Sequence, residues 1–316
     1  MITFEAPGKA VIWGEYAVLA GAPALVMAVN RYAECRIDVT GNHWALQSSG
    51  FNAHTELSLE ELLASPSTGG LTGLVKAIFE AYGNPPAPDG VVVNTDTSTF
   101  HADGNKLGIG SSAAICTASC AAFAELFGET FTERRALAAH QSLQGKAGSG
   151  LDVAAACHGG LIRFQKGESA QVDWPRTLHY QFLWAGHSTS TVNHVAAFNR
   201  WRADGTPAPL ASLCTASEAL FEELSFERLE AYVDALRRMD QEAGLGIFGP
   251  VHEGLFGLAV DAQVVYKPCG AGGGDIGIAV SDNPTALDEF LTLAHRHSVQ
   301  PLDLEIAAHG VHRIGP

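Results

Sequence analysis

Residues 107–114 read Leu-Gly-Ile-Gly-Ser-Ser-Ala-Ala, and they lie between an expected strand and an expected helix. The strand is the β-branched run at residues 91–94, and the helix is the segment 115–127, which is rich in alanine and contains no glycine or proline. A glycine-rich turn that opens directly into a helix points several free backbone N–H groups at one spot, at the positive end of the helix dipole. The segment is therefore a candidate anion site.

The residues of this turn leave two interpretations open. Ser111 and Ser112 could donate hydroxyl groups to a phosphate and provide a ligand for Mg²⁺, or they could act only as caps of the helix. The turn is not the Walker pattern G-x-x-x-x-G-K-[ST], because Lys106 precedes the glycines and no lysine follows them. A phosphate loop thus needs support from the rest of the chain.

The composition favours a globular protein of two domains that acts on a small molecule. The chain has 316 residues, of which 47% are hydrophobic, and this is enough to bury a large core. Acidic residues outnumber basic ones by 34 to 19, so the net charge of −15 argues against nucleic acid or an anionic membrane as a partner. The six cysteines form no C-x-x-C pair, and we find no signal peptide and no apolar run that could cross a membrane. We therefore expect a cytoplasmic protein, either a monomer or a homodimer.

Two further turns in the first half carry candidate catalytic residues. Residues 6–9 (Ala-Pro-Gly-Lys) predict a turn that places Lys9 at the mouth of a strand, where a cation can face a phosphoryl group. An ordinary solvated surface lysine is the alternative. The Gly/Ser-rich segment 144–152 opens an expected helix with Asp152 in its first turn. That carboxylate could act as a general base or orient a substrate hydroxyl, or it could only stabilise the helix dipole.

The second half of the chain predicts a different kind of unit. A polar stretch at residues 165–176 is the expected boundary, and we place the two domains at residues 1–170 and 171–316. Beyond it, helices and strands alternate without βαβ repeats, which indicates an α+β unit with an antiparallel sheet. Glycine clusters near residues 8, 108, 148 and 272 suggest that several loops converge on one phosphate-bearing ligand, because glycine allows close approach of the backbone.

Three segments, in this order along nearly the whole chain, resemble the motifs of the GHMP kinase superfamily. Residues 6–9 with 14–16 resemble its first motif, residues 107–114 resemble its second motif, the ATP phosphate loop, and residues 270–275 resemble its third. The resemblance implies a two-domain α+β fold. It implies an N-terminal α/β domain with a left-handed βαβ unit and a C-terminal ferredoxin-like domain.

Within the superfamily the chain is most similar to the phosphomevalonate kinases. The similarity lies in Lys106 directly before the loop, in the segment from Gln144 to the Asp152 turn, and in residues 186–191 and 267–279. The resemblance implies transfer of the γ-phosphoryl group of ATP to a small phosphorylated acceptor, with mevalonate 5-phosphate as the expected one. Kinases of the same superfamily that act on mevalonate or a sugar, a decarboxylase of this fold, and a non-catalytic binding homologue are the alternatives.

The resemblance also implies roles for individual residues. Lys9 would stabilise the transferred group, and Asp152 would pair with Lys9 and orient the acceptor. Mevalonate kinases usually have a glutamate as Mg²⁺ ligand where this chain has His140 or Gln141, so Mg²⁺ would rest on Ser112 and the nucleotide phosphates. The expected nucleotide-binding residues are Lys106, Gly108, Gly110, Ser111, Ser112 and Ala113. The expected acceptor-binding residues are Glu15, Tyr16, Lys146, Ser149, Gly150, Ser190, Gly272 and Gly273.

Overall fold

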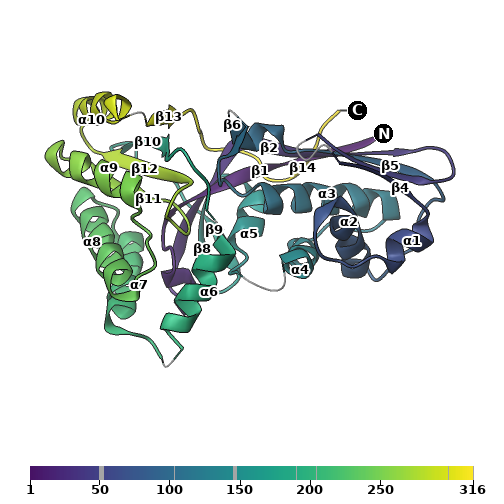
Figure 1. Ribbon diagram of the computed structural model, residues 1–316, viewed down its shortest axis with the longest axis horizontal. Helices are drawn as coiled ribbons and strands as arrows, with labels where there is room; N and C mark the ends of the chain where they lie inside the picture. Colours follow the sequence, from purple (N-terminus) through teal and green to yellow (C-terminus); the bar gives the residue numbers. More distant parts are fainter. Residues whose placement is uncertain are drawn as a thin grey trace.

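The computed structural model describes residues 1–49, 53–102, 104–144, 148–189, 191–203, 205–297 and 299–315, and two large sheets organise it (Figure 1). The first sheet has the strand order β14-β1-β2-β5-β3-β4, and β8 pairs with β2 and β9 beside it. Its strands are β1 (Ile2–Trp13), β2 (Ala24–Val39), β3 (Trp44–Ser48), β4 (Ala53–Leu57), β5 (Val91–Asp96), β8 (Leu161–Gln165), β9 (Glu168–Gln171) and β14 (His312–Arg313). Most neighbours in this sheet are antiparallel, whereas β3 and β5 run parallel. The left-handed crossover stays a prediction.

Strand β1 runs without a break through residues 6–9, so the turn expected there is wrong. A shift in register against β2 between Pro7 and Gly8 takes its place. The physical reason is that proline lacks an N–H and interrupts the ladder locally, while the long apolar strand continues on both sides. Beyond the shift Lys9 remains paired with Ala28 of β2, and its N–H donates to the Ile109 carbonyl at 2.8 Å, which joins the first motif to the second.

Helices cover one face of the first sheet (Figure 1). They are α1 (Leu59–Ala64), α2 (Gly70–Ala81), α3 (Ser111–Phe127), α4 (Glu133–Gln144) and α5 (Leu151–His158), with the short 3₁₀ turns η1 (Ala17–Ala20) and η2 (Ser98–Phe100). Helix α3 packs on β1 and β2 and is buried almost all round, as its apolar composition predicted. Helix α4 packs on α2, α3 and α5 instead of on the sheet. The expected helix at residues 115–127 and the expected helix that begins near Asp152 are thus confirmed.

The second sheet is fully antiparallel and has the order β11-β12-β10-β13. Its strands are β10 (His179–Trp184), β11 (Val265–Pro268), β12 (Ile276–Ser281) and β13 (Gln300–Leu302). The helices that accompany it are α6 (Thr191–Trp201), α7 (Ala208–Glu222), α8 (Phe226–Ala243), α9 (Pro250–Asp261) and α10 (Pro284–Arg296). Helical segments follow the first and third of its strands, β10 and β12, while β11 leads directly to its neighbour β12. This connectivity and strand order confirm the expected ferredoxin-like α+β unit.

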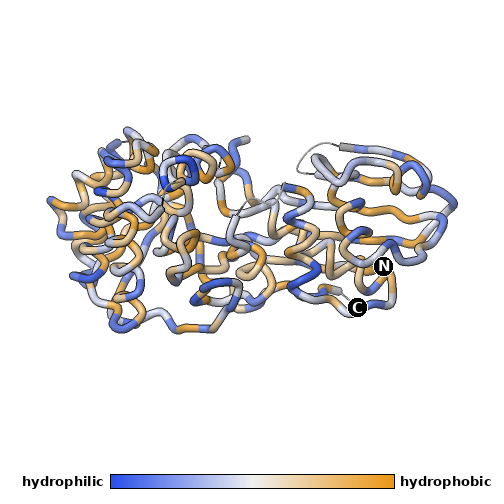
Figure 2. The backbone as a smooth tube through the Cα atoms, turned by 90° about the horizontal axis from the view of Figure 1, so that it is seen from below, coloured by the Kyte–Doolittle hydropathy of each residue, from blue (hydrophilic) through white to orange (hydrophobic). Residues whose placement is uncertain are grey.

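The chain returns to the first sheet at its end. Strand β14 pairs with β1, and Ile306 bridges to Val29 of β2. Both termini therefore lie over the first sheet, as Figures 1 and 2 show. Strand β9, which contains residue 170, also belongs to this sheet. The division of the chain at residue 170 remains a prediction.

Hydrophobic stretches run through the interior of both halves, and hydrophilic stretches lie along the outer helices and strands as well as in loops (Figure 2). In the first half, aromatic rings from three elements form a cluster under the sheet: Trp44 contacts Phe79 and Phe123, and Phe127 packs against both phenylalanines. This cluster fixes α3 against β3 and α2, and with it the position of the turn at the start of α3. Among the described helices, none is long and apolar enough to cross a bilayer.

Candidate active site

A cavity of about 340 Å³ is lined by residues of both halves of the chain. From the first half come β1, the turn before α3, one face of α4 and the turn before α5, and from the second half come α6 and the loop between β11 and β12. The expected site residues that line it are Lys9, Glu15, Tyr16, Lys106, Gly108, Ser149, Gly150 and Asp152. The fold therefore brings all three motifs and both expected catalytic residues to one place.

The other expected site residues do not line the cavity wall or are not described. Those outside the wall are Gly110, Ser111, Ser112, Ala113, Gly272 and Gly273. The first four form the start of α3, where Ser111 and Ala113 are buried and Ser112 is partly exposed. Lys146 and Ser190 lie outside the described residues.

Neither serine caps α3, so the interpretation of Ser111 and Ser112 as simple helix caps is wrong. The cap is Gly110, with φ +83°, and glycine offers no side chain to accept a hydrogen bond from the first turn. The first N–H groups of α3 have no carbonyl partner within the helix and are left for solvent or an anion. The backbone geometry of a phosphate loop is therefore present.

Lys9 lies between the second and third motifs and is not a solvated surface lysine. Its stem runs along Gly110, where an added Cβ would lie 3.0 Å from Lys9 Cγ. Its ammonium lies near Gly270, where an added Cβ would be 3.8 Å from Nζ. Two loops that carry no side chains at these points thus make room for one cation.

The expected ion pair between Lys9 and Asp152 is not formed. Both residues are described and line the same cavity, yet no ion pair within 4.0 Å joins them. Asp152 lies in the first turn of α5, and its Oδ1 accepts a hydrogen bond from the Val153 N–H at 3.0 Å. The carboxylate therefore stabilises the start of α5 while it faces the cavity.

Asp275, at the end of the third motif, is a site residue that the sequence analysis left out of its list. It lines the cavity at φ +59°, and its Oδ1 accepts a hydrogen bond from the Thr189 N–H at 3.2 Å. Burial raises the pKa of this carboxyl above its usual range, although the Thr189 hydrogen bond and the charges of Lys9 and Lys106 act in the opposite direction. The sequence feature that could have identified Asp275 as a site residue is its place directly after three glycines.

Gly108 is required because Asp275 lies directly against it. A Cβ added to Gly108 would be 2.1 Å from Asp275 Cγ, and the residue has φ +76°. A side chain here would push the second and third motifs apart. The contact explains why both motifs are glycine-rich on the sides that face each other.

The loop of the third motif is held by hydrogen bonds to three of its carbonyl groups. Thr189 Oγ1 donates to the Gly272 carbonyl at 2.9 Å, and His187 Nε2 donates to that of Gly273 at 2.9 Å. His252 Nε2 donates to the Gly274 carbonyl at 2.9 Å. His187 and Thr189 come from the segment between β10 and α6, whereas His252 comes from α9.

Glu15 lines the cavity, but both of its oxygens are already engaged. Lys267 of β11 forms an ion pair with Glu15 Oε1, and both side chains are buried. Tyr232 donates its hydroxyl to Oε2 at 2.7 Å and accepts the N–H of Gly14 at 2.7 Å. These contacts favour a role for Glu15 in joining the motifs, instead of the expected contact with the acceptor.

Tyr16 makes a second link between the first and third motifs. Its hydroxyl donates to the Ala271 carbonyl at 2.6 Å, and its backbone adopts φ +60°. Burial raises the pKa of the Tyr16 hydroxyl far above its usual range, so the group remains a neutral donor. The first motif therefore contacts the third motif and the strand before it through the side chains of Tyr16 and Glu15.

One face of α4 supplies polar groups near the start of α3. His140, Gln141 and Gln144 line the cavity, and Gln144 Nε2 donates to Ser112 Oγ at 3.0 Å. His140 is buried, and its Nε2 has no hydrogen-bond partner. The hydroxyl of Ser112 and the carboxylate of Asp152 are oxygen donors of the kind that Mg²⁺ prefers, so the donor set fits this ion. Among the described residues, no three His, Cys, Asp or Glu side chains group closely enough to hold a metal ion alone.

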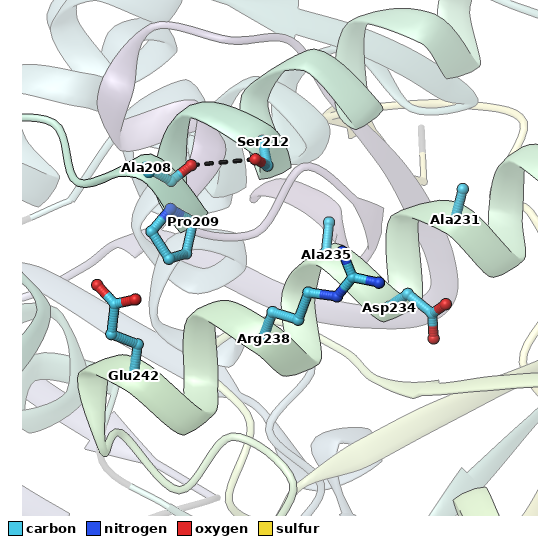
Figure 3. A pocket seen from close by; sticks show the side chains of 8 residues that line it. All are labelled: Ala208, Pro209, Ser212, Ala231, Asp234, Ala235, Arg238 and Glu242. Carbon is cyan, nitrogen blue, oxygen red and sulfur yellow. Dashed lines mark hydrogen bonds between the residues drawn. The ribbon is translucent and has the colours of Figure 1, made fainter.

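A second hollow of about 400 Å³ lies on α7 and α8 (Figure 3). Its wall combines small side chains with Asp234, Arg238 and Glu242, and Ser212 Oγ donates to the Ala208 carbonyl at 3.1 Å. None of the expected site residues lines it. The expected site residues that the structure brings together therefore lie at the cavity between the halves.

The family model described as the GHMP kinases N terminal domain matches residues 69–160. A phosphomevalonate kinase from Streptomyces sp. (strain CL190) is 30% identical, over 91% of this chain and 91% of that protein. Among solved structures, the Lin0012 protein of Listeria innocua has a TM-score of 0.82 at 18% identity, covering 100% of this chain and 99% of that one. Streptococcus pneumoniae phosphomevalonate kinase in complex with phosphomevalonate and AMPPNP has a TM-score of 0.74 at 20% identity, covering 97% of this chain and 100% of that one.

Proposed function

The chain belongs to the GHMP kinase family and is a kinase, and we propose that it transfers the γ-phosphoryl group of ATP to mevalonate 5-phosphate. The products would be mevalonate 5-diphosphate and ADP, in a step of isoprenoid precursor synthesis. The observation that carries the proposal is the similarity to a phosphomevalonate kinase along 91% of the chain. It agrees with the convergence of all three motifs on one cavity that contains two lysines.

The reaction requires mainly positioning and neutralisation of charge, which the residues of this cavity can provide. The free N–H groups at the start of α3, with the hydroxyls of Ser111 and Ser112, would hold the nucleotide phosphates. Lys9, which lies between the two loops, would neutralise charge on the transferred group, and Lys106 would add a second cation. An oxygen of the acceptor phosphate forms a bond to the γ-phosphorus as the bond from that phosphorus to the β–γ bridging oxygen breaks. ADP leaves with the electron pair of the broken bond.

The acceptor phosphate is already ionised near neutral pH, so the reaction needs no strong base. We therefore assign Asp152 an orienting role towards the acceptor and not the removal of a proton. Ser112 Oγ, which Gln144 positions, is the protein oxygen that we assign to Mg²⁺. When bound, the ion would neutralise phosphate charge and keep several waters.

We further propose a cytoplasmic location. All six cysteines are free thiols, and four of them are buried. Free buried thiols are typical of proteins that fold in a reducing compartment.

The proposal is tested by the release of ADP from Mg-ATP, measured in parallel with mevalonate 5-phosphate, mevalonate and galactose. We expect turnover with mevalonate 5-phosphate alone. The Lys9→Ala variant should lose most of this turnover. The Lys76→Ala variant is the control, because Lys76 lies in α2, pairs with Glu80 and does not line the cavity. Turnover with mevalonate or galactose, and none with mevalonate 5-phosphate, would show that the proposed acceptor is wrong.

A further inference from the structure

We propose that Arg202 and Lys166 form a second anion subsite, which binds the carboxylate end of the acceptor. This inference rests on the proposed function, because it assigns residues to the part of mevalonate 5-phosphate that does not react. The observation behind it is a side cavity of about 390 Å³ that adjoins the site cavity. The two cavities share the lining residues Val18, Leu19, Gly148, Ser149 and Val195.

The side cavity is basic in a strongly acidic protein. Lys166 lies in the turn between β8 and β9, and Arg202 directly follows α6. Neither residue forms an ion pair within 4.0 Å with any carboxylate of the described residues. Among the described residues of the side-cavity wall, none is acidic. Two unneutralised cations at one hollow are notable in a chain with net charge −15, and they favour an anionic occupant.

Arg202 is held in a fixed orientation. Its Nη1 donates to the Leu19 carbonyl at 2.8 Å, and its Nε donates to Asn199 Oδ1 at 3.2 Å. The guanidinium also lies over the ring of Phe198, with its central carbon 5.0 Å from the ring centre. Nη2 has no hydrogen bond in the described part of the chain, so its two N–H groups are left for a ligand. A guanidinium positioned in this way loses little freedom when it binds a carboxylate.

The chemistry of the acceptor matches this arrangement of charges. Mevalonate 5-phosphate carries a phosphate at its reacting end and a carboxylate at the other end. In the described walls of the two cavities, the Lys and Arg side chains are Lys9, Lys106, Lys166 and Arg202. The first two lie at the motifs, where the phosphates react, and the other two are left for the distant carboxylate. Val18, Leu19 and Val195 form an apolar wall common to both cavities, against which the methyl and methylene groups can pack.

The subsite would set specificity, because it distinguishes acceptors by the end that does not react. A sugar has no carboxylate and would leave both cations without a partner. An acceptor with an anion at each end would occupy both groups of cations. We therefore expect binding of the acceptor, and not of the nucleotide, to depend on Arg202 and Lys166.

The test compares Arg202→Gln and Lys166→Gln with wild-type protein and with Arg200→Gln. Arg200 is the matched control, because it is an exposed arginine at the end of α6 that lines neither cavity. Arg202→Gln loses the hydrogen bond to the Leu19 carbonyl, which could disturb its folding. Lys166 is exposed in a hairpin turn, so Lys166→Gln should fold in either case. The measurements are kcat, the KM of each substrate, and calorimetric Kd values for a non-hydrolysable ATP analogue and for an acceptor analogue with a carboxamide in place of the carboxylate.

We expect each variant to raise the KM of mevalonate 5-phosphate about tenfold or more, because hydrogen bonds to charged groups contribute that much to binding. The Kd of the ATP analogue should stay unchanged, and the carboxamide analogue should bind wild type and both variants equally. An unchanged acceptor KM, or equal weakening of the acceptor and its carboxamide analogue, would overturn the subsite. A wild-type protein that does not turn over mevalonate 5-phosphate would overturn the proposed function itself, and the subsite with it.

Discussion

Lys267 and Glu15 form an ion pair that is almost completely buried, with side-chain exposures of 3% and 1%. The two residues are far apart in the sequence, at the end of the first motif and on the strand that leads into the third. Tyr232 adds a hydrogen bond to the same carboxylate. The pair therefore joins the first motif to the strand that leads into the third motif, and its energetic consequences can be measured.

Replacing one member of this pair should destabilise the protein strongly. Glu15→Gln or Lys267→Met alone leaves one buried charge without its partner, which costs about 3–5 kcal/mol. The double variant Glu15→Gln/Lys267→Met removes both charges and should cost less than the sum of the single changes. The measurement is the free energy of unfolding from urea titrations. Additive losses in this cycle would show that the two charges do not depend on each other.

A side chain at Gly108 should separate the second and third motifs. Gly108→Ala should abolish most ATP binding while the protein stays folded, because the new Cβ would overlap Asp275. Gly104→Ala is a matched control, since Gly104 has φ +78° but a Cβ there would meet nothing within 4 Å. Calorimetric Kd values for an ATP analogue and the Tm separate the two effects. Equal loss of ATP affinity in both variants would indicate backbone strain and not the contact with Asp275.

The hydrogen bond from Gln144 to Ser112 should tune the dependence on magnesium. Gln144→Leu removes the donor that positions Ser112 Oγ, and we expect the Mg²⁺ concentration for half-maximal activity to rise several-fold. Binding of ATP without Mg²⁺ should not change. Ser142→Ala serves as the control on the same helix, because Ser142 contacts Ser67 and does not line the cavity. A magnesium dependence identical to that of wild type would show that Gln144 has no role in binding Mg²⁺.

His252 should make the protein less stable in acid. Its Nε2 donates to the Gly274 carbonyl, so Nδ1 accepts from the Tyr266 hydroxyl, at 2.7 Å, and the ring is neutral. Burial lowers the pKa of His252 from 6.5 to about 4. Below pH 6.5 the unfolded chain binds a proton that the folded protein takes up only near pH 4. The contribution of neutral His252 to the free energy of unfolding is therefore complete above pH 6.5. About 3 kcal/mol of this contribution is lost as the pH falls to 4.

Urea unfolding of wild type and His252→Gln at pH 7, 5.5 and 4.5 measures this contribution. The variant should be less stable at pH 7 but should lose less stability between pH 7 and pH 4.5. Parallel losses in the two proteins would mean that other groups dominate acid unfolding.

The sequence was informative where function depends on short segments. The Gly-Ile-Gly-Ser-Ser turn predicted both the start of α3 and the open N–H groups that result from a glycine at its cap. Asp152 was correctly placed in the first turn of α5. In each case the residues that decide the local backbone are adjacent in the chain, so the pattern contains the necessary information.

The sequence was less informative where the structure depends on distant partners. Residues 6–9 have the composition of a turn, but pairing with β2 keeps the segment extended. Strand β14 consists of two residues, and only its pairing with β1 defines it. The side chains of His187 and Thr189, from the segment after β10, and of His252, from α9, support the third-motif loop across long sequence distances, which no periodicity reveals.

The most direct test of the central claim is the identity of the product made from Mg-ATP and mevalonate 5-phosphate. Phosphorus NMR of the reaction mixture distinguishes a new P–O–P bond from a second phosphate ester on a hydroxyl group. We predict two coupled phosphorus resonances of an acceptor diphosphate, formed in step with ADP and absent with Lys9→Ala. A second uncoupled phosphate ester, or ADP formed without any phosphorylated acceptor, would contradict transfer to the acceptor phosphate.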